Sequence, residues 1–275
     1  MNESEFSLNG KIILVTGAGG LIGREVCDAY AAYGATVIAT DNQMPEKLDA
    51  QIANLTKRYP EGDFYGVSAD VTSEESLTKL FQGIKNKYNQ LDVLVNLAAI
   101  DAKFDDGQKA INLSRFEHYP LELWERSVAV NATGLIRVTQ HAVRLMLPRR
   151  SGNIINVAST YSLVAPNQSL YQTDAETPTV FKPIDYVGTK SMVPNFSRYV
   201  ATFYAREGIR CNTVVPHGIL NQHPKAFQDN FAKLSPLGRM CELKEIRGPF
   251  VFLASNASSY MTGSTLVVDG GWTAW

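Results

Sequence analysis

Residues 11–23, KIILVTGAGGLIG, join an apolar run directly to a cluster of glycines. The apolar run predicts a buried β-strand, and residues 21–33 carry apolar side chains at helical spacing, which predicts a helix. The glycines therefore lie at a strand-to-helix turn, where backbone N–H groups and the positive end of the helix face any ligand. Glycine also lets the backbone come close to a diphosphate. A tight turn without a ligand is the alternative on these residues alone.

An acidic residue supplies the context that this turn needs. The second apolar run, residues 35–40, is followed by Asp41, which lies 18 residues after Gly23. A carboxylate at this place can accept both hydroxyls of an adenosine ribose and repels a 2′-phosphate. No Lys or Arg follows Asp41 until Lys47. Asp41 alone could be a turn residue, but with the strand and the glycines it predicts a dinucleotide site for NAD, with NADP less favoured.

Short β-branched runs alternate with long amphipathic segments along the whole chain. This alternation predicts an α/β fold, a doubly wound parallel seven-stranded sheet forming a single Rossmann-type domain over residues 1–275. The expected strands are 11–16, 35–40, 63–68, 91–98, 152–159, 209–216 and 264–269. The expected helices are 21–33, 45–59, 73–89, 121–147, 186–207 and 242–255. Three long loops, expected at the carboxyl edge of the sheet as substrate loops, are 100–120, 160–183 and 217–240.

Composition limits the class of protein. The chain has 275 residues and a net charge of −1, which favours a small-molecule substrate and gives no support to nucleic-acid or membrane binding. The first residues resemble no secretion signal, and no apolar run is long enough to span a bilayer. Three cysteines without paired spacing fit a reducing cytoplasm, and the four histidines offer no metal-binding spacing. We therefore expect a cytoplasmic protein without a metal.

Two residues four positions apart predict acid–base chemistry. Tyr186 and Lys190 lie on one face of an expected helix, where a lysine ammonium stabilises a phenolate and lowers the pKa of the phenol. An ordinary Tyr/Lys pair on a helix face is the alternative. Asn131 occupies an inward position of helix 121–147 where an apolar residue is expected, so its amide must find partners. Ser159 ends the fifth strand at the same edge of the sheet. Pro194 predicts a kink after Lys190, because it cannot donate to the Lys190 carbonyl.

At these residues the chain resembles the short-chain dehydrogenase/reductase family. The resemblance covers nearly the full length and includes VNLAA (95–99), VNATG (130–134), NVAS (156–159), YVGTK (186–190) and the block after PLGRM (236–240). It implies a catalytic tetrad of Asn131, Ser159, Tyr186 and Lys190. The cofactor contacts predicted from the turn and implied by the resemblance are Gly17, Gly19, Gly20, Leu21, Ile22, Gly23, Asp41, Asp70, Val71, Asn96, Ala98, Ala99, Tyr186, Lys190, Pro216, Gly218 and Ile219. It also implies a homodimer or homotetramer assembled through helices 121–147 and 186–207.

The sequence departs from the short members of this family at several positions. Leu21 stands where a glycine is usual, and the spacing of Gly17, Gly20 and Gly23 is similar to that of longer members, many of them nucleotide-sugar epimerases and dehydratases. Ala99 replaces a glycine, and His217 is expected over the nicotinamide. Ser159 and Tyr186 are 27 positions apart, about twice the usual gap of the short members. The insertion predicts a larger or more polar substrate pocket.

These observations favour an NAD-dependent oxidoreductase acting on a secondary alcohol or its ketone. Polar residues of the insertion suggest a hydroxyl-rich, sugar-like substrate; they are Gln168, Gln172, Asp174 and Glu176. A faint further resemblance is to dehydrogenases of bacterial surface-sugar pathways, such as those that modify flagellin. The alternatives are a sugar epimerase or dehydratase that retains its NAD, favoured by the glycine spacing, and a non-catalytic NAD-sensing protein.

Overall fold

A computed structural model gives the structure of the chain and describes residues 4–42, 45–101, 108–171 and 181–275. Seven parallel strands form one sheet in the order β3-β2-β1-β4-β5-β6-β7. The chain starts in the middle of the sheet, runs to one edge, and returns to build the other half, so the direction of winding reverses between β1 and β4. The predicted doubly wound parallel seven-stranded sheet is therefore confirmed.

Each strand lies within a run predicted from the sequence, except that the second strand ends one residue later, at Asp41. The strands are β1 (Ile12–Thr16), β2 (Thr36–Asp41), β3 (Phe64–Ser68), β4 (Val93–Asn96), β5 (Gly152–Val157), β6 (Ile209–Pro216) and β7 (Thr265–Val268). In the register of β1, Thr16 lies opposite Thr40 of β2 on one side and Asn96 of β4 on the other. The last residues of these central strands thus face the same edge of the sheet.

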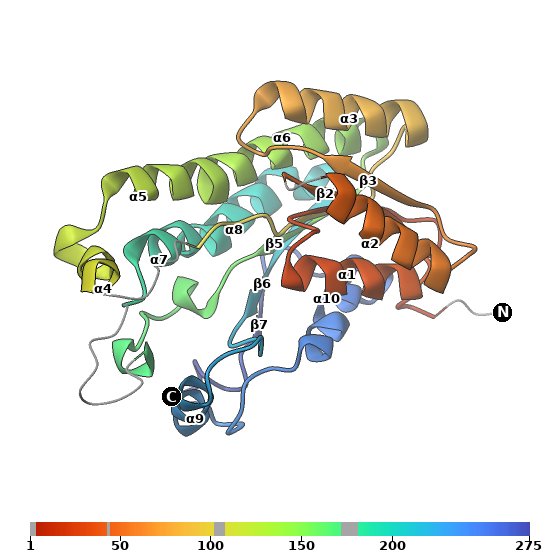
Figure 1. The fold of residues 1–275 in the computed structure, drawn as a ribbon. Coiled ribbons are helices and arrows are strands. Elements are labelled where there is room, and N and C mark those ends of the chain that lie inside the picture. The colour runs from red at the N-terminus through yellow and green to blue at the C-terminus, as the bar shows by residue number, and fades with distance from the viewer. Residues whose placement is uncertain (1–3, 43–44, 102–107, 172–180) are drawn as a thin grey trace.

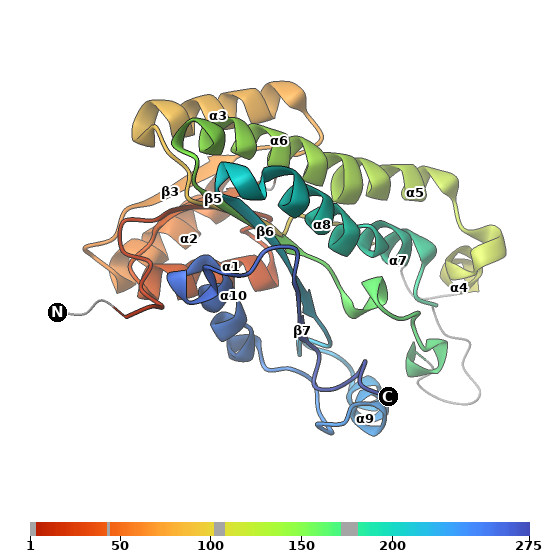
Figure 2. The same cartoon turned by 180° about the vertical axis from the view of Figure 1, so that it is seen from behind.

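Helices cover both faces of the sheet (Figures 1 and 2). They are α1 (Leu21–Ala32), α2 (Pro45–Arg58), α3 (Glu74–Tyr88), α4 (Gln108–Ser114), α5 (Leu121–Ser127), α6 (Leu135–Met146), α7 (Ile184–Ser191), α8 (Val193–Tyr204), α9 (Lys225–Leu234) and α10 (Arg247–Ala254). Short 3-10 turns occur at Phe116–His118, Leu147–Arg149, Thr160–Ser162, Gln168–Tyr171, Ala205–Glu207, Leu243–Ile246 and Asn256–Ser258.

Alternating residues of the central strands build two hydrophobic cores. In β1, Ile13 and Val15 pack with α1, α2 and α10 on one face. Leu14 between them packs with α3, α6 and α8 on the other face. Because both faces are covered, consecutive strand residues are apolar, which is why these runs do not alternate with polar residues in the sequence. The two cores fix the sheet as a rigid platform whose carboxyl edge stays open to the loops.

The ends of α3 show how the sequence sets a helix boundary. Ser73 caps the helix by accepting a hydrogen bond from the Ser76 backbone N–H at 3.2 Å. Acidic residues occupy the first turn and lysines the last turn, which complements the helix dipole. Asn89 ends the helix in the left-handed conformation, at φ 51°. Capping and charge therefore agree with the apolar stripe that the sequence analysis used.

Two parts of the sequence-based assignment need correction, and a third agrees with a predicted kink. The predicted loops 100–120 and 217–240 contain α4 and α9, because short amphipathic stretches there pack against neighbouring elements. The predicted helix 121–147 is interrupted between α5 and α6 by a π-helical segment, Val128–Gly134. The predicted helix 186–207 is divided at Met192 into α7 and α8, which agrees with the kink expected at Pro194.

Among the described helices, none combines the length and the apolar character that crossing a membrane requires.

A charge network fixes α1 against α2 and α10. The Asp28 carboxylate on α1 is nearly buried and pairs with Arg58 of α2 and with Arg247 at the start of α10. Arg247 also pairs with Glu25, one turn earlier on α1. Because α1 begins at the glycine turn, this network holds the helix that carries the candidate cofactor site.

We expect Asp28→Ala to lower the free energy of unfolding by about 2 kcal/mol, because it removes a nearly buried carboxylate and leaves the partly buried Arg247 and the exposed Arg58 without their shared partner. Urea denaturation followed by circular dichroism measures the change. The matched control is Asp63→Ala, which removes a half-exposed partner of Lys87 and should cost less than about 1 kcal/mol. Equal losses in the two variants would contradict the structural role of Asp28.

Candidate active site

A cavity of about 200 Å³ opens at the carboxyl edge of the sheet, where β1 and β4 diverge. It lies where ligands bind in open α/β sheets, at the reversal of strand order. Six of the residues predicted to contact a cofactor line it: Gly17, Gly20, Asp41, Val71, Ala98 and Ala99. The sequence pattern and the topology therefore lead to the same crevice.

The glycine turn is packed too closely for side chains at two positions. Gly17 has a φ of +68°, and a Cβ there would come within 2.8 Å of the Ala98 backbone. A Cβ at Gly23 would overlap the carbonyl oxygen of Gly17. The first glycine thus allows the turn to approach the segment after β4, and the second allows α1 to pack onto the turn. Leu21, at the usual position of another glycine, begins α1 without disturbing either contact.

The acidic residue at the end of β2 is directly connected to the glycine turn. The Asp41 carboxylate is buried and accepts a hydrogen bond from the Gly19 backbone N–H at 3.0 Å. Asp41 also lines the cavity. The carboxylate is therefore fixed at the end of the cavity where the sequence predicts the adenosine ribose.

The other predicted cofactor contacts take different positions. The side chain of Asp70 accepts hydrogen bonds from Thr72 in the turn before α3. The Asn96 amide is buried and donates to Thr139 and Asn156, at 2.9 and 2.8 Å. Neither residue lines the cavity of about 200 Å³. The remaining predicted contacts at the end of β6, the start of α1 and on α7 also lie outside its lining: Pro216, Gly218, Ile219, Gly19, Leu21, Ile22, Gly23, Tyr186 and Lys190. The cofactor roles of all these residues stay predictions.

Lys190 and Tyr186 lie together on α7. The Lys190 ammonium is buried and donates to the Val157 carbonyl at the end of β5, at 2.7 Å. Burial lowers the pKa of Lys190 to about 8, and Asp101 acts in the opposite direction. The Lys190 Nζ lies 5.8 Å from the centre of the Tyr186 ring. Burial, and then the charge of Asp101, raise the pKa of the Tyr186 phenol, and a hydrogen bond with Ser159 opposes this change.

Asn131 joins three elements from the π-helical segment. Its Nδ2 donates to the Ile100 carbonyl at 2.8 Å and to Thr189 Oγ1 at 3.0 Å, and its Oδ1 accepts from the Ile100 N–H at 2.8 Å. The sequence analysis required partners for this buried amide, and these are the partners. The segment after β4 and the helix that carries Tyr186 are thereby held at fixed positions.

Ser159 lies where β5 ends and a 3-10 turn begins. It is buried, and its hydroxyl accepts from the Tyr161 N–H at 3.3 Å. Since the Ser159 hydroxyl also interacts with the Tyr186 phenol, the four residues of the predicted tetrad gather around the same end of the sheet. Their catalytic roles stay predictions.

The sequence analysis missed two charged residues beside Tyr186. The ammonium of Lys182 lies 4.3 Å from the centre of the Tyr186 ring and forms an ion pair with Asp101. Gln168 holds the Lys182 backbone on both sides, accepting from its N–H at 2.9 Å and donating to its carbonyl at 3.2 Å. The signals in the sequence were an acid shortly after the fourth strand and a lysine four residues before Tyr186.

This contact changes the interpretation of the insertion. The Gln168 amide, which the sequence analysis offered to a substrate, is engaged with the Lys182 backbone. The other three polar residues on which that expectation rested, Gln172, Asp174 and Glu176, lie outside the described residues. Tyr161 and Tyr171, whose hydroxyls are 2.8 Å apart, provide further polar groups on the described part of the insertion.

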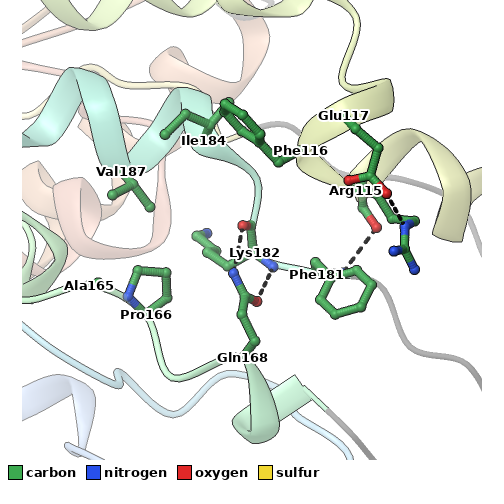
Figure 3. A pocket seen from close by; sticks show the side chains of 11 residues that line it. Arg115, Phe116, Glu117, Ala165, Pro166, Gln168, Phe181, Lys182, Ile184 and Val187 are labelled. Atoms are coloured by element: carbon green, nitrogen blue, oxygen red, sulfur yellow. Dashed lines mark hydrogen bonds and ion pairs between the residues drawn. The ribbon is translucent and has the colours of Figure 1, made fainter.

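A second cavity, of about 440 Å³, lies between described residues of the long loops 100–120 and 160–183. Figure 3 shows the side chains that line it. Lys182 and Gln168 form its floor, and two α7 residues that flank Tyr186, Ile184 and Val187, line one wall. Phe116 and Phe181 contribute aromatic surface. Because Lys182 lines this cavity and also contacts the Tyr186 ring, the cavity adjoins the predicted catalytic group.

His217 is a buried packing residue. Its ring lies 4.4 Å from the centre of Trp272 and 5.1 Å from that of Phe231, and its Nδ1 is hydrogen-bonded to the Thr160 hydroxyl. Burial lowers the pKa of His217 to about 4, and Asp269 opposes this change. At neutral pH the imidazole is therefore uncharged.

Comparison with known proteins agrees with this geometry. A family model described as enoyl-(acyl carrier protein) reductase matches residues 17–273. A protein of Mycolicibacterium smegmatis named D-threitol dehydrogenase is 30% identical over 278 residues, which covers 98% of this chain and 96% of the relative. The chain belongs to the short-chain dehydrogenase/reductase family.

Two solved structures of dehydrogenases share the fold over nearly the whole chain. A short-chain dehydrogenase from Leptospira borgpetersenii with bound NAD⁺ is 29% identical, with a TM-score of 0.82, and the match covers 98% of this chain and 95% of that one. A gluconate 5-dehydrogenase from Burkholderia cenocepacia, in complex with NADP and tartrate, is 27% identical, with a TM-score of 0.81 and full coverage of both chains.

Members of the short-chain dehydrogenase/reductase family bind a nicotinamide cofactor, and the residues present here fit such a group. A side chain at Gly17 would press on the wall of the cavity, and α1 begins at the turn with its N–H groups directed toward it. The described residues thus form a closely packed turn at the start of α1 with a buried carboxylate beside it. Their roles toward a diphosphate and a ribose stay predictions. The protein is an oxidoreductase of this family.

The depressed pKa of His217 predicts a loss of stability in acid. Protonation is harder in the folded state than in the unfolded state, so the contribution is complete above about pH 6.5 and is lost as the pH falls toward 4. The loss should amount to about 2–3 kcal/mol of unfolding free energy. Urea denaturation between pH 4 and 7 measures it.

We expect His217→Gln to flatten this pH dependence, whereas the control His118→Gln, at an exposed position, should leave it unchanged. A dependence in His217→Gln as steep as in the wild type would show that other groups cause the acid sensitivity.

Proposed function

We propose that this protein is an NAD-dependent oxidoreductase that interconverts a secondary alcohol and its ketone on a hydroxyl-rich, sugar-like substrate. The observation that carries the proposal is the position of Tyr186, beside Lys190 and Ser159 and at the same sheet edge as the glycine-turn cavity. When bound, a nicotinamide cofactor would supply the hydride donor or acceptor.

In this proposal Tyr186 exchanges a proton with the substrate oxygen. Its phenol needs help to ionise because it is buried, and the Lys190 ammonium favours the phenolate. Lys190 is held by the Val157 carbonyl, so its charge has a fixed position. Ser159 orients the substrate oxygen toward the phenol, and Asn131 fixes the helix through Thr189.

The choice of NAD rests on Asp41. A buried carboxylate at the end of β2 is suited to the two hydroxyls of an adenosine ribose and disfavours a 2′-phosphate. The solved structures reported above include one with NAD⁺ and one with NADP, so they do not decide between the two cofactors. The proposed preference for NAD therefore rests on Asp41.

A hydroxyl-rich substrate is supported by the polar groups near Tyr186 and by the polyol and sugar-acid names of the relatives. Tyr161, Tyr171 and Asp101 bring hydroxyl and carboxylate groups to one side of the site. Within one NAD-binding domain, the segments 100–120, 160–183 and 217–240 would form the walls around the substrate.

A homodimer or homotetramer is part of the proposal. Tyr199 and Phe203 on α8 are 61% and 60% exposed to solvent. Exposed aromatic pairs on a helix are typical of a surface that a partner covers. α8 lies within the predicted helix 186–207, one of the two helices through which the family resemblance implies that subunits assemble.

A substrate panel tests the activity. Polyols, sugars, sugar acids and sugar phosphates are incubated with NAD, and NADH is followed at 340 nm. Tyr186→Phe should reduce kcat/KM by about 10²–10⁴-fold, the usual contribution of a general acid–base group, while NADH binding persists. The control Tyr260→Phe, at a fully exposed position, should retain wild-type kinetics.

The same panel separates the alternatives. Conversion of a sugar without net NADH would indicate an epimerase or dehydratase that retains its NAD. NAD binding without turnover of any substrate would indicate a sensing protein.

Cofactor preference has its own test. Asp41→Asn removes the charge that disfavours a 2′-phosphate, so the ratio of kcat/KM for NAD over NADP should fall by about tenfold or more. The control Asp49→Asn changes an exposed acid of α2 and should leave the ratio unchanged. A wild-type enzyme that prefers NADP would refute the role of Asp41.

A further inference from the structure

Asp101 belongs to the long loop 100–120 and Lys182 to the long loop 160–183, and the two side chains meet beside Tyr186. Lys182 lies 4.3 Å from the centre of the Tyr186 ring, closer than Lys190 at 5.8 Å. Its side chain is only 12% exposed and is paired with Asp101. A nearly buried ammonium against the face of a phenol interacts with the ring and with any charge on its oxygen.

Both members of the pair are held by neighbours that leave little freedom. Asp101 follows Ile100, whose N–H and carbonyl are both bonded to the Asn131 amide. Lys182 has its N–H and carbonyl bonded to Gln168. The preceding Phe181 N–H donates to Ser114 Oγ at 3.0 Å. Both backbones are therefore fixed, so the charges have defined positions.

The carboxylate has an effect that the ammonium can offset. Asp101 raises the pKa of the Tyr186 phenol, because a nearby negative charge disfavours phenolate. Within the described part of the chain, Asp101 Oδ1 is buried without a hydrogen-bond partner, so Lys182 is the group that compensates this charge. An uncompensated carboxylate at this place would oppose proton release.

We propose that Lys182 is a positioning residue of the active site, which compensates the charge of Asp101 and thereby sets the pH at which Tyr186 releases its proton. This inference rests on the proposed function, in which Tyr186 exchanges a proton with the substrate. It assigns to the insertion an electrostatic role in addition to a place in the substrate wall.

The charged and titratable groups around Tyr186 come from several elements. Lys190 shares α7 with it, and Asp101 follows β4. The two tyrosines of the insertion, Tyr161 and Tyr171, face it from the 3-10 turns. On α7 itself, Asp185 accepts from Ser127 at 2.6 Å. Of these described groups, Lys190 and Lys182 are the cations near the ring.

The test uses the pH dependence of kcat/KM for alcohol oxidation, which rises as the phenol ionises. Lys182→Met leaves the carboxylate of Asp101 uncompensated, so the apparent pKa should rise by about one pH unit. Lys182→Arg retains the cation and should restore the wild-type profile. The double variant Lys182→Met/Asp101→Asn removes both charges and should return the apparent pKa toward the wild-type value.

The chain offers a matched control for a lysine that combines an ion pair with a ring contact. Lys87 pairs with Asp63 and lies 4.7 Å from the centre of the Tyr65 ring, on the exposed side of α3. Lys87→Met should leave the profile unchanged. A merely structural Lys182 would change KM or thermal stability in Lys182→Met while the apparent pKa stays at the wild-type value, which would overturn the proposal. A double variant no closer to wild type than the single variant would also overturn it.

A second measurement does not require turnover. Phenolate absorbance near 295 nm is titrated with NAD bound, and each protein is compared with the same protein carrying Tyr186→Phe, so that the difference reports on one phenol. The phenolate should appear at a higher pH in Lys182→Met than in the wild type. Absence of NADH formation in the wild-type panel would refute the proposed function. An unchanged or reversed order of the titrations would refute the role of Lys182.

Discussion

The buried amide of Asn131 is the contact on which the arrangement of the site depends. It binds both backbone groups of Ile100 and the hydroxyl of Thr189 on α7. The π-helical segment places this amide between the segment after β4 and the helix with Tyr186. An amide that is fully engaged in low-dielectric surroundings is costly to displace, so it fixes the distance between the two segments.

The parallel sheet explains why these groups meet at one edge. In a doubly wound sheet every strand ends on the same side, and the reversal of winding leaves a crevice between β1 and β4. The glycine turn forms one wall, and Asp41 lies at one end. The helix with Tyr186 is reached through the insertion after β5. Evolutionary changes in the insertions can therefore alter the surroundings of the phenol without altering the sheet or the cofactor cradle.

Sequence reasoning predicted the seven strands, the glycine turn and Asp41 because local patterns determine them, whereas Val71, Ala98 and Ala99 of the cavity were implied by the family resemblance. Consecutive apolar residues indicate strands covered on both faces, and the glycines followed by Asp41 report a turn and a strand end. It did not predict the pairing of Lys182 with Asp101. The two residues are 81 positions apart, on two different loops, and no local sequence pattern reports a contact over that distance. Nor could it show that Gln168 binds backbone groups or that His217 packs against the stacked rings of Phe231 and Trp272, because both outcomes depend on tertiary contacts.

The carboxylate of Asp101 has opposite effects on the two groups of α7: it favours the charged form of Lys190 and disfavours the phenolate of Tyr186. Burial lowers the pKa of Lys190 to about 8, and Asp101 raises it, so the carboxylate helps to keep the Lys190 ammonium charged. The same carboxylate raises the pKa of the phenol and so opposes proton release. A second cation nearer to the phenol ring than Lys190 offsets the effect of Asp101 on the phenol and leaves its effect on Lys190 in place. Lys182 has this position. The insertion between β5 and α7 thus supplies a second cation beside the phenol.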